Sequence, residues 1–291
     1  MKPLVSAVVP TLNRKDDLLH CIESVIDSSY ENIEIIVVDN ASTDGTGEAV
    51  RQLYPNVKLV RLGENTGVTG GRNVGARMAK GEFILFLDHD MIVDKELVKN
   101  LVNALKSKSV GAAGSIIYYF DEPKKIWAAG TSINMLTGKI SFNNIVIDDR
   151  AYAEVQVLPA AIMVRREVLE KVGLFDGIFF AVYEDTDFCF RVKEAGYKVV
   201  CVPNAKAWHK VPVDEKLQEL HVLSRSYYIA RNRIIFMKKH ASRKNLIIFL
   251  TFFVPIYVAY YTWRSLRRWK FRYGMDYWKG VLDGIREILK K

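Results

Sequence analysis

The stretch FILFLDHD, residues 83–90, is a run of five apolar residues that ends in two carboxylates one residue apart. Without polar alternation, residues 83–87 fit a strand that is buried on both faces of a parallel sheet. Ligands of open α/β sheets bind beyond the carboxyl ends of strands, where Asp88 and Asp90 stand. On a strand these side chains point the same way, and like charges so close repel unless a cation lies between them. A strand end with solvated aspartates is the alternative interpretation.

Strand and helix patterns alternate over the first two thirds of the chain. Continuous apolar or β-branched runs predict strands at residues 4–9, 33–38, 57–62, 110–120 and 197–202. Amphipathic patterns predict helices at residues 15–28, 46–54, 74–80, 94–106 and 166–172, whereas residues 121–156 are irregular in pattern. This order predicts an α/β fold with a Rossmann-like, mostly parallel sheet and helices on both of its faces.

Glycines at the start of a predicted helix suggest a phosphate or ribose contact. The run GVTGGRN, residues 67–73, follows a strand and would let backbone amides approach an anion. The dinucleotide fingerprint is not met, because GTGEAV at residues 45–50 lacks the third glycine. No GxxxxGK[ST] loop occurs either, so an oxidoreductase and a P-loop NTPase are both poorly supported.

Charge is distributed unevenly along this globular composition, which is 49% hydrophobic and 26% charged. Residues 206–291 hold 19 basic and 6 acidic residues, whereas residues 1–205 are mildly acidic. The basic part predicts contact with an anionic surface, either nucleic acid or a membrane. The three cysteines lie far apart and form no CxxC pair, so we expect buried thiols in a reducing compartment.

A second acidic cluster, YEDTDF at residues 183–188, stands at the head of a predicted helix. Carboxylates at a helix N-terminus are favoured by the helix dipole alone, so capping and catalysis both remain open. His209 follows the last predicted strand, where a lone histidine is more often structural than a ligand.

Five segments taken in order resemble the family 2 glycosyltransferases with the GT-A fold, over roughly residues 4–235. They are VPTLN (9–13), VVDNASTDG (37–45), residues 65–73, DHD (88–90), and EDTD (184–187) with WH (208–209). The segment YYIARNR, residues 227–233, followed by Lys239 and His240, looks most like the rhamnosyltransferase-type branch.

The resemblance implies a nucleotide-diphosphate sugar donor, linked to UDP, dTDP or GDP. Its implied contacts are Pro10, Thr11, Asn13, Asp39, Asn65, Gly71, Asn73 and Asp88. Asp90 and His209 are implied to hold Mn²⁺ or Mg²⁺, which carboxylate oxygens with an imidazole suit. His89, between the two aspartates, receives no role.

The resemblance also implies an inverting transfer, with Asp185 as the general base on an acceptor hydroxyl. The acceptor would be a lipid-linked or cell-surface glycan. Glu184, Asp187 and Arg231 are its implied contacts, although Glu184 and Asp187 are alternatively structural partners, for example of Arg191.

The C-terminal part predicts an anchor. Residues 246–262 are 17 residues without a charge, interrupted by Pro255 and flanked by basic residues at both ends. We expect an in-plane or re-entrant segment at the cytoplasmic face of the cell membrane, followed by a basic amphipathic helix. Packing on the catalytic domain or a dimer contact is the alternative. The expected domains are residues 1–215 (catalytic), 216–245 (helical connector) and 246–291 (membrane-associating tail).

Two other functions remain as alternatives. A non-catalytic nucleotide-sugar or membrane-surface module with the same fold should lack a metal or base position, and none is missing here. Nucleic-acid binding is disfavoured, because the aromatic residues of the tail sit within an apolar run rather than among basic residues. The sequence leaves open the nucleotide base, the sugar, the linkage and the oligomeric state.

Overall fold

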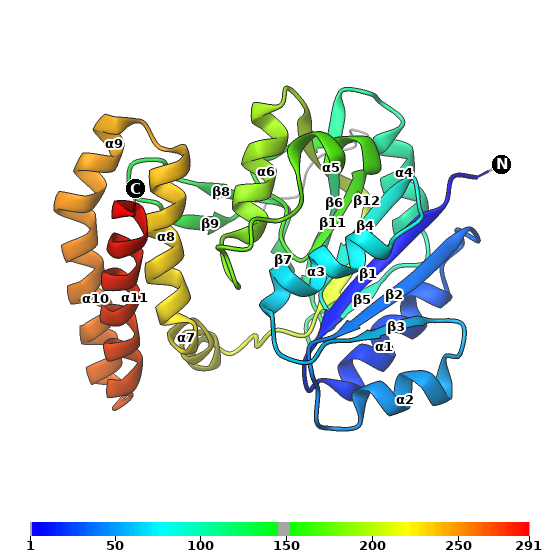
Figure 1. Ribbon diagram of the computed structural model, residues 1–291, viewed down its shortest axis with the longest axis horizontal. Coiled ribbons are helices and arrows are strands. Elements are labelled where there is room, and N and C mark those ends of the chain that lie inside the picture. The colour runs from blue at the N-terminus through cyan, green and yellow to red at the C-terminus, as the bar shows by residue number, and fades with distance from the viewer. Residues whose placement is uncertain (1, 145–151, 291) are drawn as a thin grey trace. The chain divides into compact units, whose positions relative to one another are not determined.

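A computed structural model describes residues 2–144 and 152–290, and its chain forms two compact units (Figure 1). Unit 1 comprises Met1–Ser132, Phe142–Phe180 and Glu184–Val211. Unit 2 comprises Ile133–Ser141, Ala181–Tyr183 and Pro212–Lys291. Two short internal segments thus belong to the same unit as the C-terminal helices. The three-part division expected at residues 215 and 245 stays a prediction.

Unit 1 is built on a mixed sheet with the strand order β10-β12-β6-β11-β4-β1-β2-β3. Its main strands are β1 (Val5–Thr11), β2 (Ile33–Asp39), β3 (Lys58–Arg61), β4 (Phe83–Leu87), β6 (Val110–Tyr119), β11 (Ala161–Arg165) and β12 (Lys198–His209). Strands β4, β1, β2 and β3 are parallel, and so are β12 and β6, whereas β11 runs antiparallel between the two sets. The mostly parallel α/β sheet expected from the sequence is confirmed.

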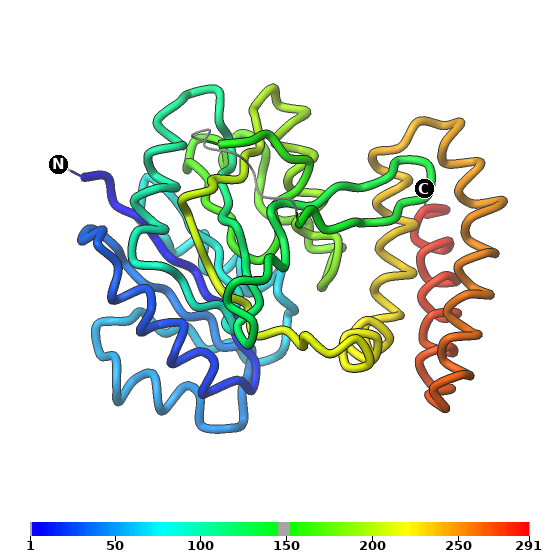
Figure 2. The backbone as a smooth tube through the Cα atoms, turned by 180° about the vertical axis from the view of Figure 1, so that it is seen from behind, coloured from blue at the N-terminus to red at the C-terminus, as the bar shows by residue number. Residues whose placement is uncertain are grey.

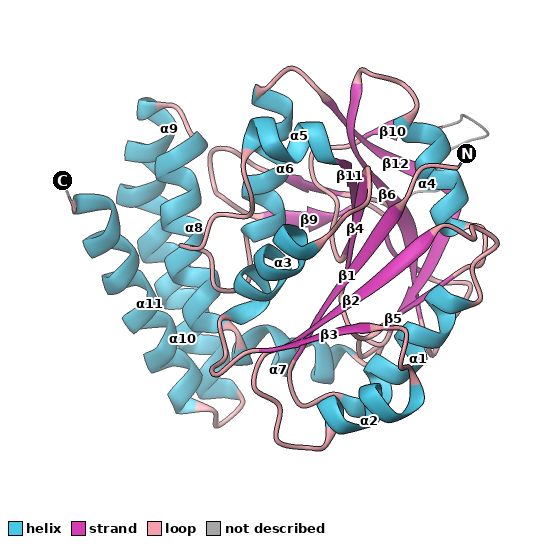
Figure 3. Ribbon diagram, turned by 45° about the vertical axis from the view of Figure 1, so that its right-hand side comes forward, coloured by secondary structure: helices cyan, strands magenta, loops and turns pink. Residues whose placement is uncertain are grey.

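Helices cover both faces of this sheet (Figure 3). One face packs against α1 (Lys15–Ile26), α2 (Thr46–Leu53) and α4 (Leu97–Leu105). The other packs against α3 (Gly67–Met78), α5 (Arg166–Val172) and α6 (Glu184–Glu194). All five residues of β4 are buried, because alternate side chains enter the two opposite cores. The three cysteines are buried and free, as expected.

Short strands were the main elements that sequence patterns missed. They are β5 (Met91–Val93), β7 (Ile126–Ala128), β8 (Thr131–Ile133), β9 (Ile140–Phe142) and β10 (Ala153–Glu154). The expectation that residues 121–156 are irregular was therefore partly wrong, although residues 145–151 lie outside the described residues. Runs of two or three residues are too short to show a period, and their pairing partners decide them.

Unit 2 is mainly helical. It contains α7 (Glu215–Ser224), α8 (Ser226–His240), α9 (Arg243–Ile248), the π-helical turn η1 (Phe249–Phe253), α10 (Val254–Arg267) and α11 (Phe271–Leu289). Helix α11 packs on both α8 and α10, and the tip of the β8–β9 hairpin lies beside α8 (Figure 2). Pro255 falls just after η1, where the π turn accommodates a residue that has no backbone N–H to donate.

One continuous helix of unit 2, Arg243–Arg267, has the length and the mean hydropathy, 1.8, of a membrane-crossing helix. Only 22% of its most apolar window is buried within the protein. Length and apolarity alone do not separate a crossing helix from one that lies on a membrane surface.

Candidate active site

Four polar residues meet at one edge of the sheet because their strands end there. Strands β1, β2 and β4 are parallel, and the reversed strand β11 brings β6 and β12 back to the same direction. The carboxyl ends of all these strands therefore share one edge, which is where open α/β sheets bind ligands. Thr11 ends β1, Asp39 ends β2, Asp88 follows β4, and His209 ends β12.

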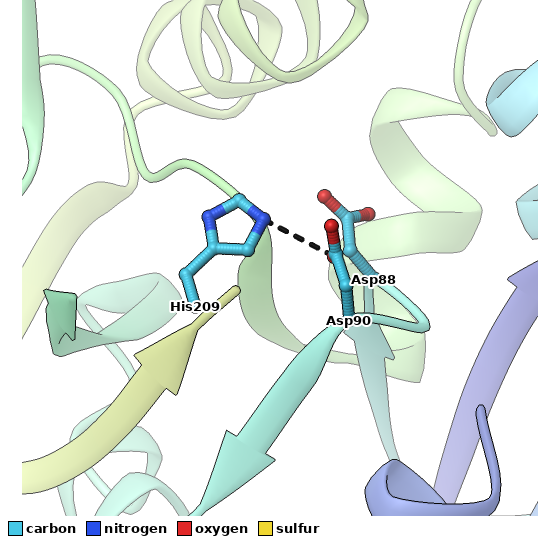
Figure 4. A group of neighbouring side chains, drawn as sticks. All are labelled: Asp88, Asp90 and His209. Carbon is cyan, nitrogen blue, oxygen red and sulfur yellow. Dashed lines mark hydrogen bonds and ion pairs between the residues drawn. The ribbon is translucent and has the colours of Figure 1, made fainter. Parts of the chain in front are cut away.

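Asp88, Asp90 and His209 form a compact cluster at this edge (Figure 4). Each offers one ligand atom, and these atoms lie within 4.8 Å of one another. Strand β4 ends at Leu87, so both aspartates lie in the turn before β5, yet their carboxylates face the same space. The backbone N–H of Lys210 donates to the Asp90 carbonyl oxygen over 3.0 Å, which joins this turn to the end of β12.

The cluster fits a divalent cation. The Nε2 atom of His209 lies 3.1 Å from Oδ1 of Asp90. Burial alone would raise the pKa of Asp90, but attraction to His209 and the bond to its ring hold that pKa well below its usual range. Two carboxylates and one imidazole suit Mn²⁺ or Mg²⁺ and leave further coordination positions for a ligand.

Two buried oxygens at the same edge have no hydrogen-bond partner among the described residues. They are Oγ1 of Thr11 and Oδ2 of Asp39, which are neighbours because Thr11 and Asp39 are in register. The other carboxylate oxygen of Asp39 accepts the backbone N–H of Ser42 over 2.8 Å, and Arg61 lies 3.7 Å from Oδ2. Buried polar atoms are rarely left unsatisfied in proteins, so this pair of oxygens indicates a polar ligand.

Residues of α3 and of the neighbouring loops hold the shape of this edge. Gly71 of α3 packs on the end of β1, where an added Cβ would lie 2.7 Å from Cβ of Pro10. Asn13, at φ 52°, accepts the backbone N–H of Thr43 over 2.7 Å. Asn65 accepts the backbone N–H of Gly67 over 2.9 Å at the start of α3. The structure thus brings Pro10 of β1, Asn13 of the following loop and Gly71 of α3 to the carboxyl end of β1.

Asn73 and Asp187 have structural contacts instead of open polar groups. The carboxamide of Asn73 donates to the Phe175 carbonyl oxygen over 2.8 Å and accepts the Phe175 N–H over 3.0 Å. Asp187 is fully buried, and its Oδ2 lies 2.8 Å from Nε of Arg191, which matches the structural alternative. Both ends of the Asn73 carboxamide thus hold the loop before α6, and its expected nucleotide contact stays a prediction.

Arg72 is the residue that sequence reasoning missed. Its fully buried guanidinium lies 2.8 Å from Oδ1 of Asp88, hydrogen-bonds to Asp185, and lies 3.8 Å from Oε1 of Glu184. It lies against the ring of Phe175, 5.1 Å from the ring centroid. The one available signal was that Arg72 is the only charged residue between positions 65 and 76, a stretch of small and polar residues.

The first turn of α6 is therefore a buried acidic cluster beside a cation that it shares with Asp88. Burial, followed by repulsion from Asp185, raises the pKa of Glu184 to about 8 despite Arg72. Burial raises the pKa of Asp185 as well; attraction to Arg72 opposes this rise and repulsion from Asp88 adds to it. Asp185 also accepts the backbone N–H of Ala160 over 3.4 Å. A carboxylate with a raised pKa is a better proton acceptor than an ordinary one.

Arg231 lies in unit 2, on α8. Its guanidinium donates to Oδ1 of Asn232 over 2.9 Å and lies 3.8 Å from Glu287 of α11. Its expected acceptor contact stays a prediction.

Comparisons with known proteins converge on one family. The sequence model described as Glycosyl transferase family 2 matches residues 6–173. Glycosyltransferase GlyG of Streptococcus pneumoniae serotype 4 is 34% identical over 125 residues, which are 42% of this chain and 42% of GlyG. The dTDP-rhamnosyl transferase RfbF of Shigella flexneri is 26% identical over 297 residues, covering 99% of this chain and 97% of RfbF.

A solved structure shares the fold. The mannosyltransferase PcManGT of Pyrobaculum calidifontis, in complex with GDP-Man and Mn²⁺, has a TM-score of 0.62 at 17% identity. The superposition covers 99% of this chain and 88% of that one. At this identity the likeness concerns the fold alone.

Proposed function

The chain belongs to glycosyl transferase family 2, and from that premise we propose an inverting, metal-dependent transfer to a hydroxyl of a lipid-linked or cell-surface glycan. The comparisons confirm three predictions from the sequence: the family, the GT-A fold, and the class of glycosyltransferase that uses nucleotide sugars. The inversion, the cation and the acceptor are parts of the proposal.

The observation that carries the proposal is the convergence of Asp88, Asp90 and His209 beside the two unsatisfied oxygens. These three residues would hold Mn²⁺ or Mg²⁺, which would neutralise charge on the leaving diphosphate. The carboxylate of Asp39 and the hydroxyl of Thr11 suit the polar groups of a nucleoside. The Mn²⁺ and GDP-Man of the mannosyltransferase with the same fold support this arrangement.

Asp185 would act as the general base. The acceptor oxygen attacks the anomeric carbon from the face opposite the diphosphate, and its proton passes to a carboxylate oxygen of Asp185. The bond from the anomeric carbon to the phosphate oxygen breaks, and its electron pair leaves with the diphosphate. Burial at the start of α6 and the raised pKa support this role.

A thermal-shift titration tests the donor site. We expect one of dTDP, UDP, GDP and CDP to stabilise the protein with Mn²⁺, by about 2.7 kcal/mol at a hundredfold excess over Kd. The near full-length similarity to a dTDP-rhamnosyl transferase makes dTDP the first choice. Asp90→Ala should abolish the Mn²⁺-dependent stabilisation, whereas Asp121→Ala, on an exposed loop, should retain it. Equal stabilisation of both variants would contradict the metal site.

Membrane association through unit 2 is the second part of the proposal. One face of the helix Arg243–Arg267 exposes large apolar side chains at helical spacing, namely Phe252, Ile256, Tyr260 and Trp263. Basic residues follow on the same helix, among them Arg267. We propose that this face lies on the anionic cytoplasmic surface of the cell membrane as a peripheral or monotopic contact.

Flotation with anionic vesicles tests this contact. Removal of residues 243–291 would also delete α11, which covers α8, so surface substitutions are the sharper test. Wild type should float with the vesicles, and Ile256→Glu with Trp263→Glu should not. Leu217→Glu, at an exposed leucine of unit 2 on α7, is the control and should still float. Unchanged flotation of the double variant would contradict the proposed face.

A further inference from the structure

Two consecutive residues before α6 have an uncommon backbone conformation. Val182 has φ 67° and Tyr183 has φ 75°, and they directly precede Glu184 and Asp185. The left-handed region is sterically unfavourable for an L-residue, and a β-branched side chain there is a genuine outlier. Such a conformation persists only where the surroundings hold it, and it is often found at functional sites.

Asn232 holds the backbone of this segment. Its carboxamide nitrogen donates to the carbonyl oxygens of Ala181 and Val182, over 2.7 Å and 2.8 Å. Its Oδ1 accepts from the guanidinium of Arg231, so both donors and the acceptor of the carboxamide are used. Asn232 is fully buried on α8, which makes its orientation well defined.

The side chain of Tyr183 is held as well. Its hydroxyl donates to the Gly138 carbonyl oxygen over 2.6 Å and accepts from Nε of Arg233 over 3.0 Å. Gly138 is at the turn of the β8–β9 hairpin, where an added Cβ would lie 2.8 Å from Cγ of Arg233. Residues 181–183 are thus held by Asn232 and Arg233 of α8 and by the β8–β9 hairpin, all within unit 2.

The chain just upstream is fixed to α3, the helix that carries Arg72. The hydroxyl of Thr69 donates to the Phe179 carbonyl oxygen. Gly67 lies against Phe180, where an added Cβ would lie 2.3 Å from the carbonyl oxygen. With residues 179 and 180 fixed on one side, the dihedral angles of residues 181–183 determine the direction in which the chain enters α6.

We propose that Asn232 is a positioning residue for the transfer reaction. By holding two carbonyl groups of a strained segment, it sets the start of α6 and hence the place of the Asp185 carboxylate. The inference rests on the proposed role of Asp185 as general base. It assigns a physical task to the asparagine of the segment YYIARNR, whose contribution the sequence did not reveal. A shift of about 1 Å in a reacting group can reduce a rate 10²-fold, so a contact of this kind has a measurable effect.

Hydrogen exchange and turnover together test the proposal on the full chain. Asn232→Ala removes both donors, and Asn232→Asp also places a carboxylate against two carbonyl oxygens. Ser226→Ala is the matched control, because Ser226 is equally buried on α8 and donates to the Tyr273 carbonyl oxygen over 2.7 Å, away from residues 181–183. Turnover is measured as hydrolysis of the nucleotide sugar that the thermal-shift panel selects. Water then takes the place of the acceptor, Mn²⁺ is present, and the released nucleoside diphosphate is quantified.

In both Asn232 variants we expect exchange of the amides of residues 181–188 to rise about tenfold or more, and elsewhere to stay near wild type. The value of kcat should fall about 10–100-fold while KM for the donor stays within about twofold. Asn232→Asp should show the larger change, and Ser226→Ala should change neither quantity. Exchange that rises equally across the chain, or unchanged kcat in both variants, would overturn the proposal.

Failure of the base assignment can be told apart from failure of this inference. If Asp185→Asn retained turnover, Asp185 would not be the base, and any local rise in exchange in the Asn232 variants would mark a structural restraint only. If Asp185→Asn lost turnover while the Asn232 variants kept it, the base would stand and the positioning role would fall.

Discussion

Two acidic clusters of unit 1 have opposite electrostatic character, although the sequence presents both as short runs of carboxylates. Asp88 and Asp90 lie beside His209, and the pKa of Asp90 is held below its usual range. Glu184 and Asp185 are buried at the start of α6, and the pKa of Glu184 is raised to about 8. The surroundings of Asp90 favour its ionised form, whereas those of Glu184 and Asp185 favour protonation.

Attraction to His209 lowers the pKa of Asp90, whereas burial and then repulsion from Asp185 raise that of Glu184; Arg72 links the two clusters. Its guanidinium contacts Asp185 and Asp88, so a single buried cation serves parts of both clusters. One positive charge cannot neutralise three carboxylates, and burial then favours a proton on Glu184. The comparison teaches that burial and the charges next to each carboxylate, more than the number of carboxylates, decide which form an acidic run favours.

The largest expected effect concerns the cluster that takes a proton. Asp185→Asn keeps the size of the side chain and removes its basicity, so turnover should fall about 10²–10⁴-fold. Nucleotide stabilisation in Mn²⁺ should stay near wild type in the same variant, because Asp90 and His209 are unchanged. Steady-state kinetics and the thermal-shift titration check the two halves. Turnover above about a tenth of wild type would show that the two clusters do not differ in this way.

The shared cation gives the second prediction. Arg72→Met leaves buried carboxylates without a partner, so the free energy of unfolding should fall by about 3–5 kcal/mol. Urea unfolding monitored by circular dichroism measures it. Arg286→Met, which removes an exposed arginine paired with Asp283, should cost less than about 1 kcal/mol. Similar losses in the two variants would mean that Arg72 does not link the clusters.

The smallest expected effect, counted per pH unit, is a dependence of stability on pH in the metal-free protein. The pKa of Glu184 is about 8 when folded and about 4.3 when unfolded, so its contribution is fully present below the lower value. That contribution is lost as pH rises through the folded pKa, because the unfolded chain releases its proton first. Relative to Glu184→Gln, wild type should therefore become less stable between about pH 5 and 8, by at most about 1.4 kcal/mol per pH unit.

Urea unfolding of both proteins at several pH values measures this difference. Glu82→Gln, which alters an exposed carboxylate, controls for the general effect of removing a charge. A constant difference between Glu184→Gln and wild type across the window would contradict the raised pKa and remove the contrast between the clusters.

Local sequence patterns were enough to predict much of the fold and many of the candidate residues. Strand β4 is buried on both faces, as its apolar run predicted, because a run without polar side chains has no face suited to water. The strand end at Leu87 predicted a site at Asp88 and Asp90, whereas the extension of β12 to His209, which brings the imidazole to the same edge, lies beyond the strand predicted at residues 197–202. Family resemblance added the roles of these residues, which a pattern of types and spacings cannot supply.

The sequence by itself determined the alternation of strands and helices, the edge at which polar residues gather, and the apolar helix of unit 2. Only the tertiary structure decided that Arg72 contacts Asp185 across 113 positions of sequence, and that Asn232 holds the backbone before α6. It also decided that the carboxamide of Asn73 hydrogen-bonds to the backbone of Phe175. Strand and helix patterns depend on neighbours a few positions away, whereas the partner of a buried polar group depends on which distant segments the fold brings together.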